Sequence, residues 1–181
     1  MYGLVNKAIE ELVLANHGVE AWDQISKKAG VHGEIFISNE AYPEEITYRL
    51  VTEASGYLKV PAEAILFSFG EWWVLETAQK SYGPMMAMAG RTLREFLIHL
   101  PNFHTRVKMM YPKLNPPTFR CTEIMENSLC MHYISDRPGL SPFVKGLLSG
   151  LGKMFNTPVN VEHISQKDAG ADHDVFKVQW S

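Results

Sequence analysis

The chain has 181 residues, of which 46% are hydrophobic and 20% are charged, and its net charge of -3 goes with a pI near 6.2. This composition is ordinary for a globular protein with one core or two closely packed lobes, and it predicts no general attraction to nucleic acid or anionic lipid. No stretch approaches the ~18 uninterrupted apolar residues of a membrane span, and the start lacks a secretory signal, so we expect a soluble, cytoplasmic protein with no membrane partner.

The first two thirds of the chain carry helical periodicity. Helices are expected at residues 2–16, 19–28, 44–57 and 62–79, in a short methionine-rich piece after a turn at Gly83-Pro84, at 93–100, and from beyond Pro101 to about residue 110. His17-Gly18 and Ala29-Gly30 are typical helix ends, and residues 31–43 look irregular and polar.

The remainder of the chain changes to a period of two. Three prolines predict a stiff, non-helical connector over residues 111–119. Strands are expected at residues 118–124, 128–135, 159–165 and 175–180, with a glycine-dotted helix at 143–155 between the two pairs. Helices followed by a small antiparallel sheet predict an α+β fold.

His104 is the first candidate functional residue. It lies on the apolar helical stripe of Leu97, Leu100, Val107 and Tyr111, where a leucine would pack without needing a hydrogen-bond partner. A lone histidine on such a face is more often a satisfied core residue. A single imidazole among apolar and methionine side chains is, however, what an axial ligand of haem iron requires. The residues alone leave these two interpretations evenly balanced.

The segment HYISDR provides the second candidate. Alternate side chains of a strand share a face, so Tyr133, Ser135 and Arg137 would form a row of donors about 13 Å long, able to grip a carboxylate. Considered alone, a solvated strand face is the simpler interpretation. Pro116-Pro117 likewise stiffens a loop or presses a rigid ring edge against a flat ligand, and spacing does not decide between the two.

Other chemistries find little support. The two cysteines, Cys121 and Cys130, can make one disulfide at most, and no CxxC motif or His/Cys cluster predicts a zinc site. The sequence also lacks a GxGxxG motif, a Walker loop and a GxSxG motif.

Taken together, these segments resemble the haem nitric oxide/oxygen binding (H-NOX) family, found alone in bacteria and as the N-terminal sensor of the soluble guanylate cyclase beta subunit. The resemblance rests on MYGLVNKAIEELV, FGEWW, NFHTRV, YPKLNPPTFRC, HYISDR and GADHDVFKV, in this order. It implies a single domain over residues 1–181, with a helical distal lobe at about 1–60 and a proximal lobe with a four-stranded antiparallel sheet at about 61–181. Haem would be buried between them.

The resemblance also implies roles for particular residues. His104 would be the axial iron ligand of a non-covalent haem b, ferrous in the sensing state. Tyr133, Ser135 and Arg137 would bind the haem propionates, and Pro117 would press on the porphyrin. The distal pocket would be lined by Val5, Ile9, Trp73 and Phe143.

The gas that such a pocket prefers depends on hydrogen-bond donors. Oxygen-binding relatives carry a tyrosine five residues after the motif arginine, and here that position is Pro142. One lost polar bond is worth about 1–3 kcal/mol, or roughly tenfold or more in affinity. The resemblance therefore implies a nitric oxide sensor that also binds CO and discriminates against oxygen.

The signal implied is weakening or breaking of the bond between iron and His104, followed by haem relaxation and lobe movement. The partner would be a histidine kinase, a cyclic-di-GMP enzyme or a guanylate cyclase output domain, with no catalysis by this chain. The alternatives are an oxygen-binding or redox-sensing haem domain and a haem-free interaction domain. A haem peroxidase would need acid–base groups over the iron, and the matched distal positions are apolar.

Overall fold

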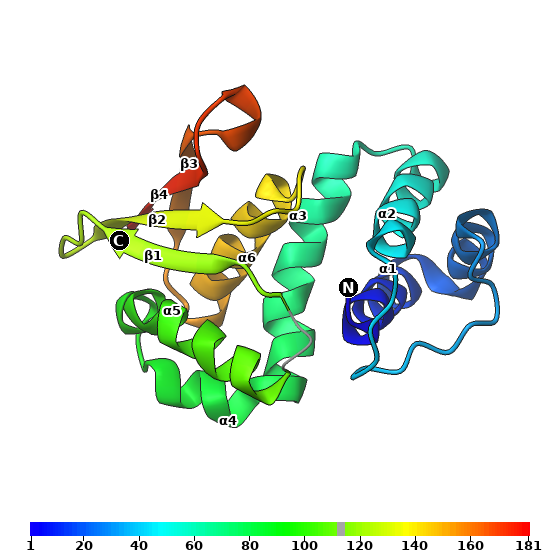
Figure 1. Cartoon of the computed structure of the whole chain (residues 1–181), viewed down its shortest axis with the longest axis horizontal. Helices are drawn as coiled ribbons and strands as arrows, with labels where there is room; N and C mark the ends of the chain where they lie inside the picture. Colours follow the sequence, from blue (N-terminus) through cyan, green and yellow to red (C-terminus); the bar gives the residue numbers. More distant parts are fainter. Residues whose placement is uncertain (112–114) are drawn as a thin grey trace.

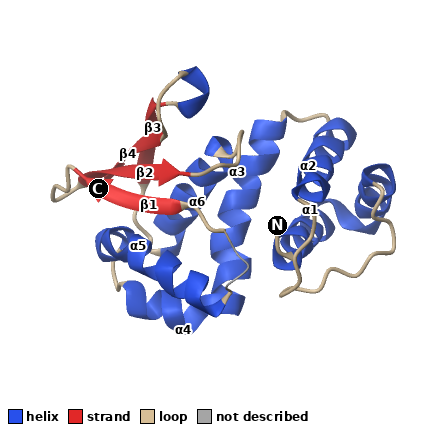
Figure 2. Ribbon diagram, in the orientation of Figure 1, coloured by secondary structure: helices blue, strands red, loops and turns tan. Residues whose placement is uncertain are grey.

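The computed structural model describes residues 1–111 and 115–181, so part of the predicted proline-rich connector, residues 112–114, lies outside the described residues. Helices and one sheet make up the α+β fold expected from the sequence (Figures 1 and 2). The elements in chain order are α1 (Gly3–Ala29), α2 (Glu44–Leu58), α3 (Ala62–Trp72), the π-helix η1 (Trp73–Ala78), α4 (Gln79–Ala89), α5 (Leu93–Met110), β1 (Thr118–Thr122), β2 (Ser128–Ile134), α6 (Ser141–Met154), β3 (Val159–Ser165), the 3₁₀-helix η2 (Lys167–Ala169) and β4 (Asp174–Trp180). No described helix is long and apolar enough to cross a membrane.

The N-terminal helices build one hydrophobic core. The predicted break after residue 16 is present, because Gly18 interrupts α1 with φ 81° and ψ 178°, a conformation open to glycine. A bridge between Tyr2 and Ala41 ties the start of the chain to the irregular segment before α2. The buried members of this core are Ala8, Ile9, Val13, Ala21, Ile25, Ala29, Val31, Phe36, Ile46, Leu50, Val51, Ala54 and Phe69.

A second core lies beneath the sheet. Buried residues of η1, α4, α5 and α6 pack there against side chains of the sheet, and fully buried members include Leu97, Met131, Phe176 and Val178. Figure 1 shows α3 standing between the first two helices and the part that carries the sheet. Trp73 packs against both cores and therefore lies at the junction, and Phe143, which packs against the N-terminal core, forms an edge-on contact with it.

Two predicted interruptions are wrong, because both prolines lie inside continuous helices. Pro84 is exposed within α4, and continuing that helix buries Met86 and Ala89. Pro101 lies within α5 and removes the backbone donor that would reach the Leu97 carbonyl. The thiol of Cys121 donates to that carbonyl instead, at 3.2 Å, so the helix continues through the proline to His104.

The sheet has the strand order β1-β2-β4-β3, with every neighbouring pair antiparallel. It confirms the four expected strands, although β1 ends at Thr122 and β2 at Ile134, so Ser135 falls in the turn that follows. In the register of the first pair, Phe119 faces Tyr133, and the two rings lie 5.5 Å apart. This pair points under the sheet toward α5.

Two glycines let α3 and α6 approach closely. A Cβ atom on Gly70 would meet the Phe143 carbonyl, and one on Gly146 would meet the Phe67 carbonyl. Both glycines are buried, and the contact holds the start of α6 against α3. This packing fixes Phe143 beside the aromatic residues of α3.

Candidate functional site

A cavity of about 230 Å³ lies at the junction of the two cores. Its wall includes residues before and within α1, α3, η1, α4, α5 and α6, together with the segment that leads into β1. Most of the lining side chains are hydrocarbon or aromatic. A cavity of this kind suits a flat, apolar ligand.

His104 lines the cavity from α5. Its neighbours on the predicted stripe, Leu97, Leu100 and Val107, are buried, which confirms the orientation of that helix face. The imidazole is packed 4.8 Å from the ring of Phe119. Its Nδ1 atom is buried and has no hydrogen-bond partner among the described residues. Burial lowers the pKa of His104 to about 4, so the ring is a neutral nitrogen donor at physiological pH.

Another part of the cavity wall is aromatic. Phe69 and Phe143 have ring centroids 5.0 Å apart, and Trp73 lies edge-on to both rings. Val5 also lines the cavity. Ile9 does not, because it is 2% exposed inside the N-terminal core.

The position matched to the tyrosine of oxygen-binding relatives is not part of this wall. Pro142, the position expected to face the gas, is absent from the cavity lining, whereas Phe143 is part of it. The difference arises because α6 has already begun at Ser141, and its first turn places Phe143 in the cavity wall and against Phe69 of α3. The sequence-based expectation of an apolar distal side does not change, since neither proline nor phenylalanine carries a donor.

A second, more polar hollow adjoins the cavity and shares Pro116, Pro117 and Arg137 with it. We call it the polar hollow. Its other lining residues are Glu44, Tyr48, Asn115, Thr118, Ile134, Ser135, Asp136 and Pro138. The aromatic cavity therefore has one polar end, next to the turn after β2.

The predicted donor triplet is found at this junction, but not as a row along one strand. Since β2 ends at Ile134, only Tyr133 belongs to the strand; it is buried, lines the cavity, and has its pKa raised by burial. Ser135 and Arg137 lie in the turn, where the Ser135 hydroxyl accepts a hydrogen bond from the Arg137 backbone N–H at 3.1 Å. The turn carries the guanidinium to the polar hollow instead of extending it along a strand face.

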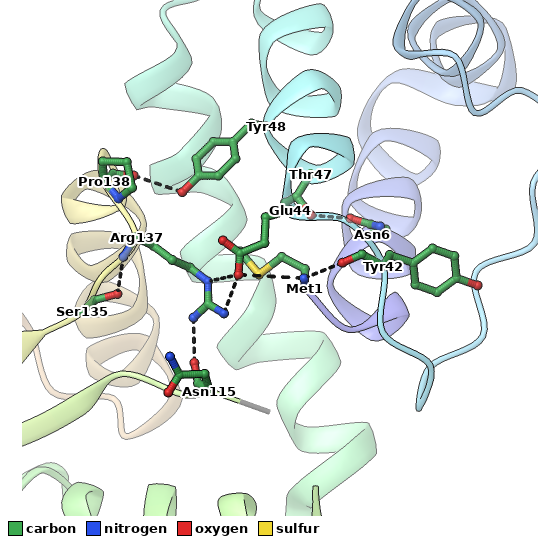
Figure 3. Close-up of polar contacts among 10 residues, drawn as sticks. All are labelled: Met1, Asn6, Tyr42, Glu44, Thr47, Tyr48, Asn115, Ser135, Arg137 and Pro138. Atoms are coloured by element: carbon green, nitrogen blue, oxygen red, sulfur yellow. Dashed lines mark hydrogen bonds and ion pairs between the residues drawn. The ribbon is translucent and has the colours of Figure 1, made fainter. Parts of the chain in front are cut away.

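Sequence reasoning missed the partners of Arg137. Its guanidinium contacts the carboxylate of Glu44, 93 residues away, at 2.8 and 2.7 Å, and the Asn115 carbonyl at 2.8 Å (Figure 3). No local pattern could have identified Glu44. Phe69 was also missed, although its spacing of four residues from Trp73 in FGEWW puts both on one helix face.

The residues present fit a haem group. The cavity is apolar, a neutral imidazole lacks a partner at its wall, and an arginine, a serine and a tyrosine gather at its polar end. Pro116 and Pro117 line both spaces. Within residues 1–111 and 115–181 no cluster of three His, Cys, Asp or Glu side chains could hold a bare metal ion.

Comparison with known proteins points in the same direction. The model of the Haem-NO-binding family matches residues 2–163. Two soluble guanylate cyclases of Caenorhabditis elegans are similar to this chain. One, gcy-32, is 30% identical over 98% of the chain, and the other, gcy-31, is 24% identical over all of it. The chain spans only 28% and 26% of those relatives, about a quarter of their length.

Solved structures share the fold. An H-NOX protein from S. oneidensis in the Fe(II)NO ligation state matches all of this chain and 99% of its own, with a TM-score of 0.90 and 19% identity. An unliganded Fe(II) H-NOX protein from K. algicida matches all of this chain and 97% of its own, with a TM-score of 0.84 and 24% identity. An oxygen-binding H-NOX domain, in its oxygen complex, also has a TM-score of 0.84, with 18% identity, and it matches all of this chain and 95% of its own. The same fold therefore occurs in one protein solved in the Fe(II)NO state and in another solved as an oxygen complex.

Proposed function

The chain belongs to the Haem-NO-binding (H-NOX) family of haem-based gas sensors, and from that premise we propose that it senses nitric oxide and discriminates against oxygen. The observation that carries this proposal is His104, a neutral imidazole without a partner for Nδ1 among the described residues, at the wall of an apolar cavity. Its role is regulatory, with no catalysis of its own.

Non-covalent haem b is the proposed cofactor, and in its ferrous form it supplies an iron position for NO or CO. His104 would ligate the iron. Tyr133, Ser135 and Arg137 would receive the propionates at the polar end of the cavity, and Pro117 would contact the porphyrin. In support, both cysteines are free, and neither lies in a CxxC haem-attachment motif.

Selectivity would come from the wall opposite His104. Phe69 and Phe143 present only hydrocarbon there, and Trp73 adds one indole N–H. Thr47 also lines the cavity, but its hydroxyl donates to the Asn6 side-chain oxygen at 2.6 Å and is engaged. Oxygen in a haem pocket gains from a hydrogen-bond donor, whereas NO depends on one much less. This wall therefore favours NO.

Signalling would pass through α5. With haem bound, His104 would anchor α5 near its C-terminal end, and loss of this anchor on NO binding is the proposed signal. Tyr111, directly after α5, packs against Tyr2 of the N-terminal helices, so movement of α5 reaches the other core. An output partner can respond to an equilibrium between two arrangements of α5 against the N-terminal helices if it binds one of them more tightly.

The output partner is proposed to be a histidine kinase, a cyclic-di-GMP enzyme or a guanylate cyclase output domain. We place the protein in the cytoplasm, and the two free cysteines are consistent with a reducing compartment. The separate cores support the proposed division of a single domain into lobes at about residues 1–60 and 61–181.

Absorbance spectroscopy of the purified ferrous protein tests the function. We expect a Soret band that shifts with NO and with CO and does not change with O₂ in air-saturated buffer. A stable oxygen complex in air would contradict NO selectivity. Protein without haem after reconstitution would contradict the sensor assignment as a whole.

A further inference from the structure

Arg137 is shared between the two parts of the molecule. It lies in the turn after β2, whereas Glu44 is the first residue of α2 in the N-terminal helices. The Glu44 oxygen Oε1 accepts from Arg137 Nε at 2.8 Å and lies 2.7 Å from Nη2, so it is held by one edge of the guanidinium (Figure 3). Only 15% of the Arg137 side chain is exposed, against 41% for Glu44.

The guanidinium still has donors to offer. Arginine carries five N–H groups in a planar fork. Glu44 engages one on Nε and one on Nη2, and the Asn115 carbonyl engages one on Nη1 at 2.8 Å. One N–H on each terminal nitrogen therefore has no partner in these contacts. Because Arg137 lines both the cavity and the polar hollow, a second carboxylate can be received without displacing Glu44.

A second contact joins the same helix to the same turn. Tyr48, one turn after Glu44 on α2, donates its hydroxyl to the Pro138 carbonyl at 3.1 Å. This hydrogen bond does not involve the guanidinium. The neighbouring Glu45 is exposed, and no hydrogen bond or ion pair of its side chain occurs among the described residues. Glu45 thus provides a matched control for Glu44, and Tyr48 provides a comparison, because it also joins α2 to the turn but does not contact the guanidinium.

We infer that Glu44 is a positioning residue for haem binding: it holds the Arg137 guanidinium at the polar hollow and so links haem retention to the position of α2. The inference rests on the proposed function, in which Arg137 receives a haem propionate. A long arginine side chain loses many rotamers when it binds a ligand, and a guanidinium already held by Glu44 and Asn115 has lost them beforehand.

A competing effect has the opposite sign. The charge of Glu44 repels a second carboxylate, and if this repulsion dominated, Glu44 would weaken haem binding. Water reaches Glu44 because its side chain is 41% exposed, and this screens the repulsion. The direct bonds to the more buried Arg137 are screened less. Positioning therefore outweighs repulsion, and removal of the Glu44 charge should speed haem loss.

Transfer of haem from the loaded protein to excess apomyoglobin measures this loss directly. Arg137→Ala and Glu44→Gln should both accelerate it, the latter by about threefold to tenfold. Glu45→Gln should leave the rate within about twofold, and Tyr48→Phe, which removes the other contact between α2 and the turn, should accelerate haem loss less than Glu44→Gln does. In the Arg137→Ala background, Glu44→Gln should have no further effect, because it acts through the guanidinium. Thermal unfolding of the haem-free variants reports folding separately.

The outcomes separate the inference from its premise. If Arg137→Ala loses haem faster than wild type but Glu44→Gln loses it at the same rate or more slowly, the positioning role is overturned and the proposed function stays intact. An acceleration by Tyr48→Phe equal to that of Glu44→Gln would also overturn it, since a general tie between α2 and the turn would then suffice. If Arg137→Ala loses haem at the wild-type rate, the propionate assignment fails, and the inference fails with it. Should Glu44→Gln not fold, Glu44→Asp replaces it, with faster loss expected from its shorter reach.

Discussion

The ring of Tyr2, just before α1, packs edge-on against the ring of Tyr111, just after α5, with centroids 5.7 Å apart and planes at 71°. This contact joins the N-terminal helices to the helix that carries His104. We expect Tyr2→Leu and Tyr111→Leu to show a coupling free energy of about 0.5–1.5 kcal/mol in a double-mutant cycle. Urea unfolding of the four proteins measures it.

The matched control for this pair is Phe103→Leu. Phe103 lies on α5, where it packs against Phe96 of the same helix and Tyr82 of α4. It forms no ring contact with Tyr2 among the described residues. Its cycle with Tyr2→Leu should give a coupling energy near zero. An equal coupling in both cycles would mean that Tyr2 senses the general stability of the protein, so Tyr111 would not be a specific route between the lobes.

Replacement of His104 tests the ligand assignment. His104→Gly should abolish stable haem binding, because the cavity then has no nitrogen donor at that wall. Added imidazole should restore the Soret band by filling the space that the side chain leaves. His99→Ala is the control on the same helix, since His99 is bonded through Nδ1 to the Ala89 carbonyl at 2.9 Å. A haem-loaded His104→Gly protein without imidazole would contradict the assignment.

The fold was predictable where periodicity is strong and local. The break at Gly18, helix α2, the strand β3 and the buried stripe around His104 all follow from spacing in the sequence. Pro101 misled because its effect on α5 depends on Cys121, a residue 24 positions from the carbonyl that it contacts. The path of Arg137 was equally out of reach, since its turn is fixed by contacts with distant residues.

Phe143 tests the proposed gas selectivity. Phe143→Tyr adds a phenol hydroxyl to the cavity wall beside Phe69 and Trp73. A new hydrogen bond is worth about 1–3 kcal/mol, so oxygen affinity should rise by about fivefold to 150-fold, with little change for NO. Oxygen titration of the ferrous protein, followed by absorbance, measures the change. Phe143→Leu is the control without a donor, and an equal gain there would assign the effect to pocket volume.

Cys121 is expected to support the helix that carries His104. Burial raises the pKa of its thiol to about 11, so the thiol stays protonated and donates to the Leu97 carbonyl at 3.2 Å. Cys121→Ala should lower the free energy of unfolding by about 1–3 kcal/mol, because that carbonyl loses its partner beside Pro101. Cys121→Ser keeps a donor and should lose less. Equal losses in urea unfolding would show that the sulfur contributes only packing.

The pair of His132 and His173 should make stability depend on pH. His132 Nδ1 lies 2.8 Å from His173 Nε2, and His132 Nε2 lies 2.7 Å from the Thr122 hydroxyl. Burial, then the charges of Arg120 and His173, hold the pKa of His132 below its ordinary 6.5, against a smaller opposing effect of Glu123. The unfolded chain therefore binds the proton first as pH falls through about 6.5. The free energy of unfolding declines below that pH and does not depend on this histidine above it.

Thermal unfolding between about pH 8 and pH 5 measures this decline. The melting temperature should fall less steeply with pH in His132→Gln than in wild type, whereas the exposed His17→Gln should keep the wild-type slope. Equal slopes for all three proteins would show that the acid sensitivity arises outside the His132 and His173 pair.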